Sequence, residues 1–498
     1  MKRVLSIACV LACSSGNGGG TDPTLLTDPI AQNVTITQLT ILQSLEIPVM
    51  ANGAAATRGG TDAKGNPYTY PLIAQRDSIL RVYVTPESGF STHALTARAR
   101  IVTTSPTGSQ AQVFAGTGTI STPSQQFDLT STINIPIPGV ALERGSSITV
   151  VVNDKTGDSA STPSSNARWP QDGSLADLDV RDGADKVRVM IVPVQYGADG
   201  SQRVPDTSDA QIESYRKRFY QVYPAAQMEI TVHDPWPSNT AIDAGGGGMG
   251  TLLTALAQLR GQDQADPDLY YYAAFDPAPT FGQFCGGGCV TGLSNIGAPT
   301  SVGIGYGGGA AEDTAIHEVG HAHGLSHAPG EKVNGTAGCG VDPSGIDPAY
   351  PYLSGSIGVW GYDTFAATPD VAMLDPAKWE DMMSYCSPKW ISDYHYGKIF
   401  NRVRTDNKYF NDWMPGLGPR YVPGAIDTVT SSTIHAGGAA TRERWITQGE
   451  PREITWAGGS ATAYFFPYDH LPGGTLYVPD EVPSGARLRG DVNAIIVR

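Results

Sequence analysis

Charged residues are scarce in this chain of 498 residues: Asp, Glu, Lys and Arg together make up only 16% of it. That share is too small for a disordered polyelectrolyte or a long coiled coil. The formal net charge is −15, and no basic run occurs anywhere in the sequence. Nucleic acids and anionic lipid surfaces select clustered Lys and Arg, so we expect no nucleic-acid partner and no electrostatic adsorption to a membrane.

Long apolar runs are missing too, and after the N-terminus no segment is long and apolar enough to span a bilayer. At the N-terminus, the positive residues Lys2 and Arg3 precede a short apolar stretch, 4–12, which is followed by Cys13. This arrangement resembles a bacterial lipoprotein signal that is cut before Cys13, whose thiol would carry the lipid. The alternative is an ordinary secretory signal with an incidental cysteine, since Leu11 is not the small residue favoured there. Both interpretations predict an exported protein, either a lipoprotein of the bacterial cell surface or outer membrane or a secreted protein.

Cysteine is rare, with six in the chain, two of them in the signal. An even number in the remainder of an exported chain predicts two disulfide bonds. A small local loop from Cys285 to Cys289, with a second bridge from Cys339 to Cys386, is one of three possible pairings, and the sequence does not choose between them. The competing interpretation is zinc binding by these four residues, but their spacing fits no common zinc finger.

Glycine and proline are plentiful, with 59 Gly and 36 Pro against 33 Lys and Arg. This balance favours many turns and short strands, and the length allows several domains. Residues 14–30, small and polar, predict a flexible tether after the signal of residues 1–13. β-Branched runs between turn residues predict an N-terminal β-sandwich over 31–170, with strands near 79–84, 99–102 and 147–152. A linker is predicted at 171–185.

From Lys186 onward, strands are predicted to alternate with helices, as in an α/β unit. The spacing of Ser208 and Gln211 is that of a helix capping box. The unit is expected to span 186–412, and β-like runs after it predict a small C-terminal β-domain at 413–498. Strands are predicted at 187–194, 228–232, 269–275 and 301–306, and helices at 209–222, 250–260 and 393–404.

Four of the nine histidines fall within residues 314–327, TAIHEVGHAHGLSH. His317 and His321 are four residues apart, so on a helix both project from one face and can bind the same ion. Gly324 can adopt the left-handed conformation that ends a helix, and the resulting turn would bring His327 back as a third ligand. Three neutral imidazoles leave one position open for water, which is typical of a catalytic zinc site.

Glu318 follows the first ligand, so its carboxylate can reach a zinc-activated water without binding the metal. Zinc lowers the pKa of its water from about 16 towards roughly 7. Glu318 would take the proton as this water attacks a peptide carbonyl, and would deliver it to the leaving amine. A bare H-E-x-x-H arises easily by chance, whereas the full H-E-x-x-H-x-x-G-x-x-H is far more restrictive. His323 lies off the ligand face and is expected to lie on the surface or to support a ligand from behind.

Residues 317–327 resemble the zinc motif of the metzincin metalloproteases. That family also has a methionine turn beneath the metal, and Met383 in the segment DMMSYC resembles it. The resemblance implies that Tyr385 binds zinc or stabilises the oxyanion, as in astacin-like and serralysin-like members. It covers roughly 186–410 and implies an α/β (α+β) zincin catalytic domain, flanked here by β-sandwich-type domains. By the same analogy, the strand at 301–306 would be an edge strand that pairs with substrate backbone.

The resemblance implies an exported endopeptidase that uses one zinc ion, with Glu318 as general base, on extracellular proteins or glycoproteins. The flanking β-domains and the cysteine pattern also resemble secreted bacterial metalloproteases that cleave mucin-type glycoproteins. One alternative is a catalytically inert zinc-binding adhesin or glycan-binding surface lipoprotein, which would have no need of Glu318. Another is zinc-dependent hydrolysis of a non-peptide substrate, which the methionine turn disfavours.

Little chemistry is predicted elsewhere in the chain. Carboxylates at 178–183 could hold calcium, but their spacing fits no calcium loop and favours a solvated linker. The sequence leaves open the cleavage-site preference and the oligomeric state. The remaining histidines are expected to be structural or exposed: His93, His233, His395, His435 and His470.

Overall fold

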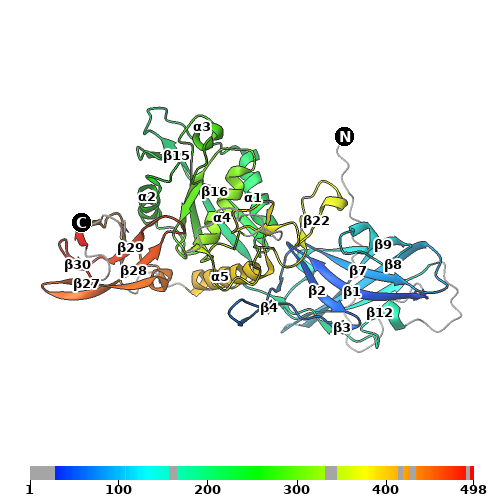
Figure 1. Cartoon of the computed structure of the whole chain (residues 1–498). Coiled ribbons are helices and arrows are strands. Elements are labelled where there is room, and N and C mark those ends of the chain that lie inside the picture. Colours follow the sequence, from blue (N-terminus) through cyan, green and yellow to red (C-terminus); the bar gives the residue numbers. More distant parts are fainter. Residues whose placement is uncertain are drawn as a thin grey trace. The chain divides into compact units, whose positions relative to one another are not determined.

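The computed structural model describes residues 29–106, 108–155, 165–330, 345–412, 419–426, 433–489 and 494–497. Strands outnumber helices, and they form several sheets, so the fold is multidomain and β-rich, as predicted at this coarse level (Figure 1). The chain divides into two compact units. The first contains Met1–Gly60, Pro67–Asp182 and Val359–Pro376, and the second contains Thr61–Asn66, Gly183–Gly358 and Ala377–Arg498.

The first unit holds two antiparallel sheets of five strands each. Strand β9 (Gly108–Ile120) of one sheet packs tightly on β10 (Ile133–Ile137) of the other, because a Cβ on Gly116 would lie only 2.2 Å from the carbonyl oxygen of Asn134. One sheet has the order β10-β7-β1-β2-β3: β10 (Ile133–Ile137), β7 (Ser78–Pro86), β1 (Val34–Leu42), β2 (Glu46–Ala51) and β3 (Ala54–Ala55). The other has the order β12-β11-β8-β9, with β13 paired to β11: β12 (Arg168–Trp169), β11 (Ser146–Asn153), β8 (His93–Ser105), β9 (Gly108–Ile120) and β13 (Ala176–Asp177).

Two segments belong to this first unit although the sequence predicted otherwise. The predicted linker 171–185 contains β13 and β14 (Val180–Arg181), and β14 pairs in parallel with β6 (Leu72–Ile73). The segment Val359–Pro376 lies within the predicted catalytic domain 186–412, but its backbone bonds to the first unit, where Tyr362 N donates to Ser44 O over 2.8 Å. Pairing with distant strands holds the first segment there, and an apolar cluster with Leu42 and Leu129 holds the second; local patterns report neither.

The second unit is built around a mixed six-stranded sheet of order β16-β15-β18-β20-β19, with β17 paired to β15. Its strands are β15 (Lys186–Tyr196), β16 (Gln227–Val232), β17 (Trp236–Ser238), β18 (Leu269–Phe275), β19 (Gly292–Ser294) and β20 (Thr300–Ile304). The strand predicted as the sheet edge, 301–306, corresponds to β20, and that prediction is wrong. β20 is paired on both sides, in parallel with β18 and antiparallel with β19. The edge strand is the three-residue β19, which is too short to show any period in the sequence.

Five helices in the described part of this unit include all three that were predicted: α1 (Asp209–Val222), α2 (Met249–Gln262), α3 (Phe281–Cys285), α4 (Ala310–Ala322) and α5 (Asp393–Asp412). At the start of α1, the Ser208 side chain accepts a hydrogen bond from Gln211 N, as the capping-box spacing predicts. The Gln211 side chain does not complete the box and donates instead to Glu312 on α4 over 3.0 Å. No described helix is both long and apolar enough to cross a membrane.

The strands after α5 form a seven-stranded sheet within the second unit, which we call the C-terminal sheet. It joins the six-stranded sheet just beyond β19, where Asn295 forms a β-bridge with Tyr468, and Ile296 N donates to Pro467 O over 2.9 Å. Its order is β25-β29-β28-β27-β30-β31-β26: β25 (Tyr421–Ile426), β29 (Gly474–Pro479), β28 (Gly459–Pro467), β27 (Glu450–Trp456), β30 (Arg487–Leu488), β31 (Ile495–Val497) and β26 (Thr433–His435).

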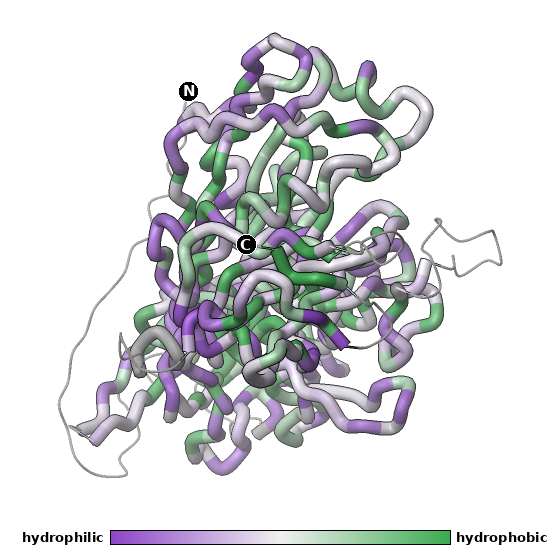
Figure 2. Tube along the Cα trace, turned by 90° about the vertical axis from the view of Figure 1, so that its left-hand side faces the viewer, coloured by the Kyte–Doolittle hydropathy of each residue, from purple (hydrophilic) through white to green (hydrophobic). Residues whose placement is uncertain are grey.

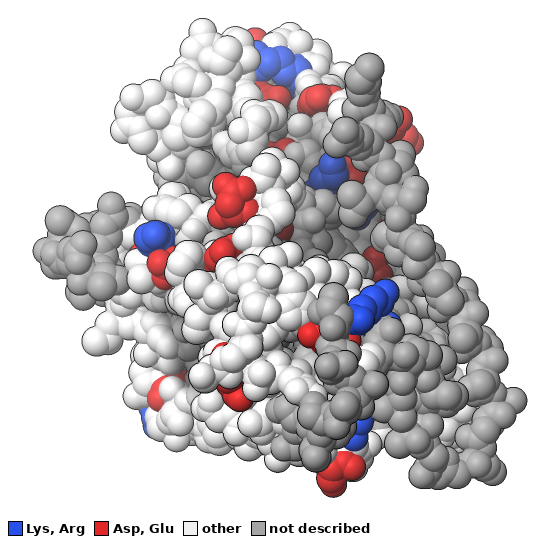
Figure 3. Space-filling model, turned by 90° about the vertical axis from the view of Figure 1, so that its right-hand side faces the viewer, with Lys and Arg blue, Asp and Glu red and all other residues white. Residues whose placement is uncertain are grey.

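Hydrophobic and hydrophilic positions are interleaved along the chain, as expected for strands and helices that bury one side (Figure 2). On the face drawn in Figure 3, the Lys and Arg side chains lie singly among Asp and Glu. The calcium alternative at 178–183, which the sequence already disfavoured, gains no support, because no described group of three possible metal ligands contains Asp179 or Asp182.

Candidate metal centre

Helix α4 carries the first two candidate ligands. Its N-terminus is fixed by Glu312, whose carboxylate accepts a hydrogen bond from Gly309 N over 3.0 Å. The negative charge of Glu312 also interacts favourably with the positive N-terminal end of the helix dipole. His317 and His321 lie one turn apart on the same face, and their ring centroids are 4.7 Å apart. Both side chains are buried.

The third candidate ligand arrives through a sharp turn after α4. Gly324 has φ +92°, and a Cβ there would meet no atom within 4 Å. Glycine is therefore required by the left-handed backbone and not by lack of space, which confirms the predicted conformation. Gly324 N donates to His321 O over 2.7 Å. The chain then returns His327 to the site, with its Nε2 3.2 Å from the Nε2 of His321.

The hydrogen bonds of the rings show that this group suits a metal ion. The Nδ1 atoms of His317 and His321 each lie 2.8 Å from a backbone carbonyl oxygen, of Met382 and Leu325 respectively. A neutral imidazole that donates from Nδ1 has a lone pair on Nε2. The two Nε2 atoms are 3.1 Å apart, so two lone pairs face each other unless a cation lies between them.

Burial also favours the neutral, metal-binding form of all three rings. It lowers the pKa of His317 and His321, and it lowers the pKa of His327 to about 3. The buried group can therefore hold a metal ion, and its geometry alone leaves the identity of the metal open.

Glu318 lies between the ligands and a pocket of about 480 Å³. Among the described residues, its Oε2 atom is buried and has no hydrogen-bond partner. Burial, reinforced by the negative charge of Asp469, raises the pKa of Glu318. The edge strand β19 passes directly beside it, because a Cβ on Gly292 would lie 2.6 Å from Glu318 Cγ. A buried, unpartnered carboxylate with a raised pKa is typical of a group that transfers protons.

The predicted methionine turn lies against α4. Met383 is fully buried, and a Cβ on Gly320 would lie 2.6 Å from its Sδ atom, so glycine allows the helix to approach the turn. Asp381 holds the turn in place, because its Oδ1 accepts from Met383 N and from His395 Nδ1, each over 2.8 Å. Its Oδ2 accepts from Ser392 N over 2.8 Å. The same turn supplies the Met382 carbonyl that orients His317.

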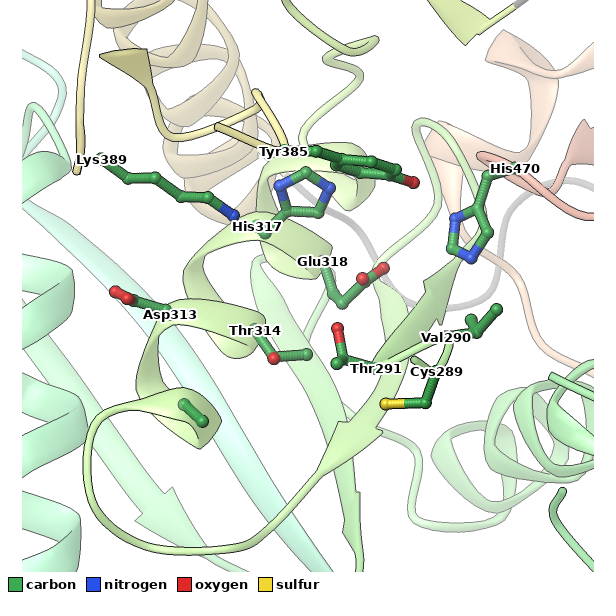
Figure 4. Close-up of a pocket in the computed structure, with 11 residues that line it drawn as sticks. Cys289, Val290, Thr291, Asp313, Thr314, His317, Glu318, Tyr385, Lys389 and His470 are labelled. Atoms are coloured by element: carbon green, nitrogen blue, oxygen red, sulfur yellow. The ribbon is translucent and has the colours of Figure 1, made fainter. Parts of the chain in front are cut away.

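Tyr385 lies above the histidines, with its ring centroid 4.9 Å from that of His327 and 5.9 Å from that of His317. The side chain lines the pocket, and its hydroxyl points to the side where Glu318 and His470 lie (Figure 4). The structure thus places Tyr385 where a group on the substrate could contact it.

Two residues of the site were missed by the sequence analysis, and both follow β28 of the C-terminal sheet. Asp469 is fully buried, with Oδ2 3.3 Å from His321 Nε2 and with Oδ1 accepting from Ser294 N over 2.9 Å. Its carboxylate also bonds to Nδ1 of His470. His470, which was expected to be structural or exposed, is half-buried, and its ring lines the pocket on the side opposite Lys389 (Figure 4).

Although burial opposes the charged form, interactions with His321 and His470 keep the pKa of Asp469 below its ordinary value. An ionised Asp469 therefore lies beside the candidate metal position. No local pattern near the histidine motif could have revealed it.

The other predicted residues have mixed outcomes. Cys285 and Cys289 form a disulfide, which is one of the three pairings that the sequence left open, with Cα atoms 4.9 Å apart, and Cys289 lines the pocket. Cys13 and Cys339 lie outside the described residues, so the lipidation and the bridge to Cys386 stay predictions. His323 is not on the surface; it is buried and stacks on Tyr270 with ring centroids 4.0 Å apart.

Comparison with known proteins gives local similarity only. No protein-family model matches the chain. Dictomallein of Burkholderia pseudomallei strain 1710b is 28% identical over 207 residues, which is 36% of this chain and 27% of Dictomallein. Dictomallein of Burkholderia mallei strain SAVP1 has the same identity and coverage. The chain thus spans about a quarter of the length of the curated relatives it matches.

Proposed function

We propose that this chain is an exported zinc endopeptidase of the metzincin type. One observation carries the proposal: the Nε2 atoms of His317, His321 and His327 converge beside a pocket that also contains the unpartnered carboxylate of Glu318. Three imidazoles on one helix and the turn after it form the ligand set of a catalytic zinc site, in which a fourth position is left for water. The arrangement of α4, the Met383 turn and the mixed sheet supports the proposed metzincin-like α/β domain.

A zinc ion at this site would supply Lewis acidity, which lowers the pKa of water to about 7 and polarises a carbonyl group. The chain's own residues do the rest. Glu318 accepts a proton from the attacking water and returns it to the leaving amine. Tyr385 reaches over the pocket and donates a hydrogen bond to the oxyanion that develops on the peptide carbonyl. Edge strand β19, beside Glu318 at Gly292, offers backbone groups for an extended substrate.

The direct test compares the wild type with Glu318→Gln on a panel of unmodified and mucin-type glycosylated proteins, with and without a zinc chelator. We expect Glu318→Gln to keep its zinc and to lose roughly 100- to 10,000-fold in hydrolysis rate, because the proton acceptor is gone. Glu453→Gln, at an exposed position on β27, is the matched control and should cleave like the wild type.

Equal rates for Glu318→Gln and wild type would remove Glu318 from the reaction. A zinc-loaded wild type that binds glycoproteins but cleaves none would favour the inert adhesin instead.

A further inference from the structure

Lys389 brings a positive charge to the wall of the pocket opposite His470. It lies on the short strand β24 (Lys389–Trp390), which pairs in parallel with β23 (Glu380–Asp381) next to the methionine turn. Its backbone is held by Arg218, whose guanidinium donates to Lys389 O over 3.1 Å. Figure 4 shows the side chain extending along the pocket with its amine directed towards His317.

This ammonium group has no anionic partner among the described residues. The carboxylates nearest to it are already engaged: Asp313 pairs with Arg218 over 2.7 Å, and Asp381 pairs with His395 over 2.8 Å. The carboxylate of Glu318 points to the other side of the pocket, towards His470 (Figure 4).

Burial lowers the pKa of Lys389, and the nearby negative charge of Asp313 offsets only part of that effect. Lys389 is half-buried, so its charge is only partly solvated and a bound anion would stabilise it.

The pocket also offers hydroxyl groups to an anion. Thr291 and Thr314 line it between Lys389 and the disulfide, and Figure 4 shows both side chains at its inner wall. A carboxylate has two oxygens, one for the ammonium and one for a hydroxyl donor. A doubly charged phosphate would be disfavoured, because Asp313 and Glu318 lie in the same pocket.

We propose that Lys389 makes the enzyme select substrates that carry a carboxylate next to the scissile bond. This inference rests on the proposed peptidase function, and it names the substrate class. The carboxylate has two possible sources, an Asp or Glu side chain of the substrate or an acidic sugar on a neighbouring glycan. In both, a salt bridge to Lys389 forms at the half-buried wall of the pocket, where it is less screened than at an open surface.

The experiment measures cleavage of a peptide mixture in which each position around the cut is Asp, Asn or Lys, together with O-glycosylated peptides that carry or lack a terminal acidic sugar. Mass spectrometry of the products reports the preference. We expect the wild type to favour a carboxylate at one position by tenfold or more. Lys389→Arg should keep that preference, Lys389→Met should lose it, and Lys389→Glu should turn it into a preference for Lys.

A purely structural role for Lys389 could lower every rate but could not reverse the preference. Lys408→Glu, at an exposed position on α5, is the control for a change in net charge. Zinc content and melting temperature verify that each variant is folded. The inference is overturned if the wild type cleaves without preference for a carboxylate, or if Lys389→Glu keeps the wild-type preference.

A binding measurement separates this inference from the proposed function. Calorimetry on zinc-loaded protein compares the Asp peptide with the Asn peptide, in both the wild type and Lys389→Glu. If no peptide is cleaved but the Asp peptide binds more tightly and Lys389→Glu reverses the order, the peptidase proposal fails and the role of Lys389 stands. Equal binding of the two peptides to the wild type overturns the role of Lys389.

Discussion

Replacing Asp381 by Asn should destabilise the turn that orients His317 and so weaken metal binding, although Asp381 contacts no candidate ligand. The carboxylate is fully buried and accepts three hydrogen bonds, from Met383 N, Ser392 N and His395 Nδ1. An amide has one oxygen in place of two, so at least one buried N–H group would face another donor. Leaving a buried hydrogen-bonding group without its partner typically costs about 1–3 kcal/mol.

In the second unit, of about 300 residues, this loss corresponds to a melting temperature lower by about 2–5 °C. The Met382 carbonyl that orients His317 belongs to the same turn, so zinc affinity should also fall, by roughly 10- to 100-fold. Differential scanning calorimetry and competition with a chelator measure the two effects. Asp234→Asn, at an exposed position, is the control.

The pH dependence provides a second check on Asp381. Burial alone would raise its pKa, but His395 and the other hydrogen-bond donors hold the pKa below its ordinary value. The pKa of Asp381 in the folded protein lies below the unfolded value of about 3.9. The stability that ionised Asp381 adds is therefore complete above pH ~3.9 and is lost as the pH falls through the folded pKa. Asp381→Asn should therefore be less stable than the wild type at neutral pH, with a smaller difference below pH ~3. A loss under 1 kcal/mol at neutral pH with unchanged zinc affinity would refute the argument.

Three further predictions concern the other parts of the site. Loss of a residue that only hydrogen-bonds to a metal ligand lowers metal affinity by roughly 10- to 100-fold. His327→Ala should lower zinc affinity by more than that, while His435→Ala should not lower it; equal zinc content after dialysis would contradict the assignment of His327 as the third ligand. Gly324→Ala should destabilise the protein by about 1–3 kcal/mol because φ is +92°, whereas Gly282→Ala, with open space and ordinary φ, should be neutral; equal unfolding midpoints would count against strain at Gly324. Replacing Cys285 and Cys289 by Ser removes a loop of sequence separation 4 and should cost about 2 kcal/mol of stability under oxidising conditions; unchanged stability of the oxidised forms would show that the bridge contributes nothing.

Local patterns predicted much of the second unit. Helix 209–222 and strand 269–275 were predicted at their observed boundaries. The cap residue Ser208 marked the start of the helix, and an apolar run marked the extent of the strand. The return of His327 was predictable for the same reason, since Gly324 and both neighbouring ligands lie within a few residues of each other.

What the sequence could not show depends on contacts between distant segments. Asp469 approaches His321 only because β28 and the strands around it dock beside β19, and nothing near Asp469 signals that contact. The edge strand was assigned to β20, because a three-residue β19 has no period to detect. His395 was grouped with scattered histidines, since its partner Asp381 becomes visible only when α5 packs behind the turn.

The link between Asp469 and His321 also has a consequence for the order in which the site forms. A chain made from its N-terminus presents α4 well before β28. Until the C-terminal sheet has docked, Ser294 N lacks its carboxylate acceptor and His321 lacks its acidic neighbour. The site is therefore finished late, and in a refolding time course protection of the Ser294 amide from hydrogen exchange should follow, not precede, formation of the central sheet. If the chain is the exported hydrolase proposed above, such a delay would keep the reactive centre incomplete during most of its passage out of the cell.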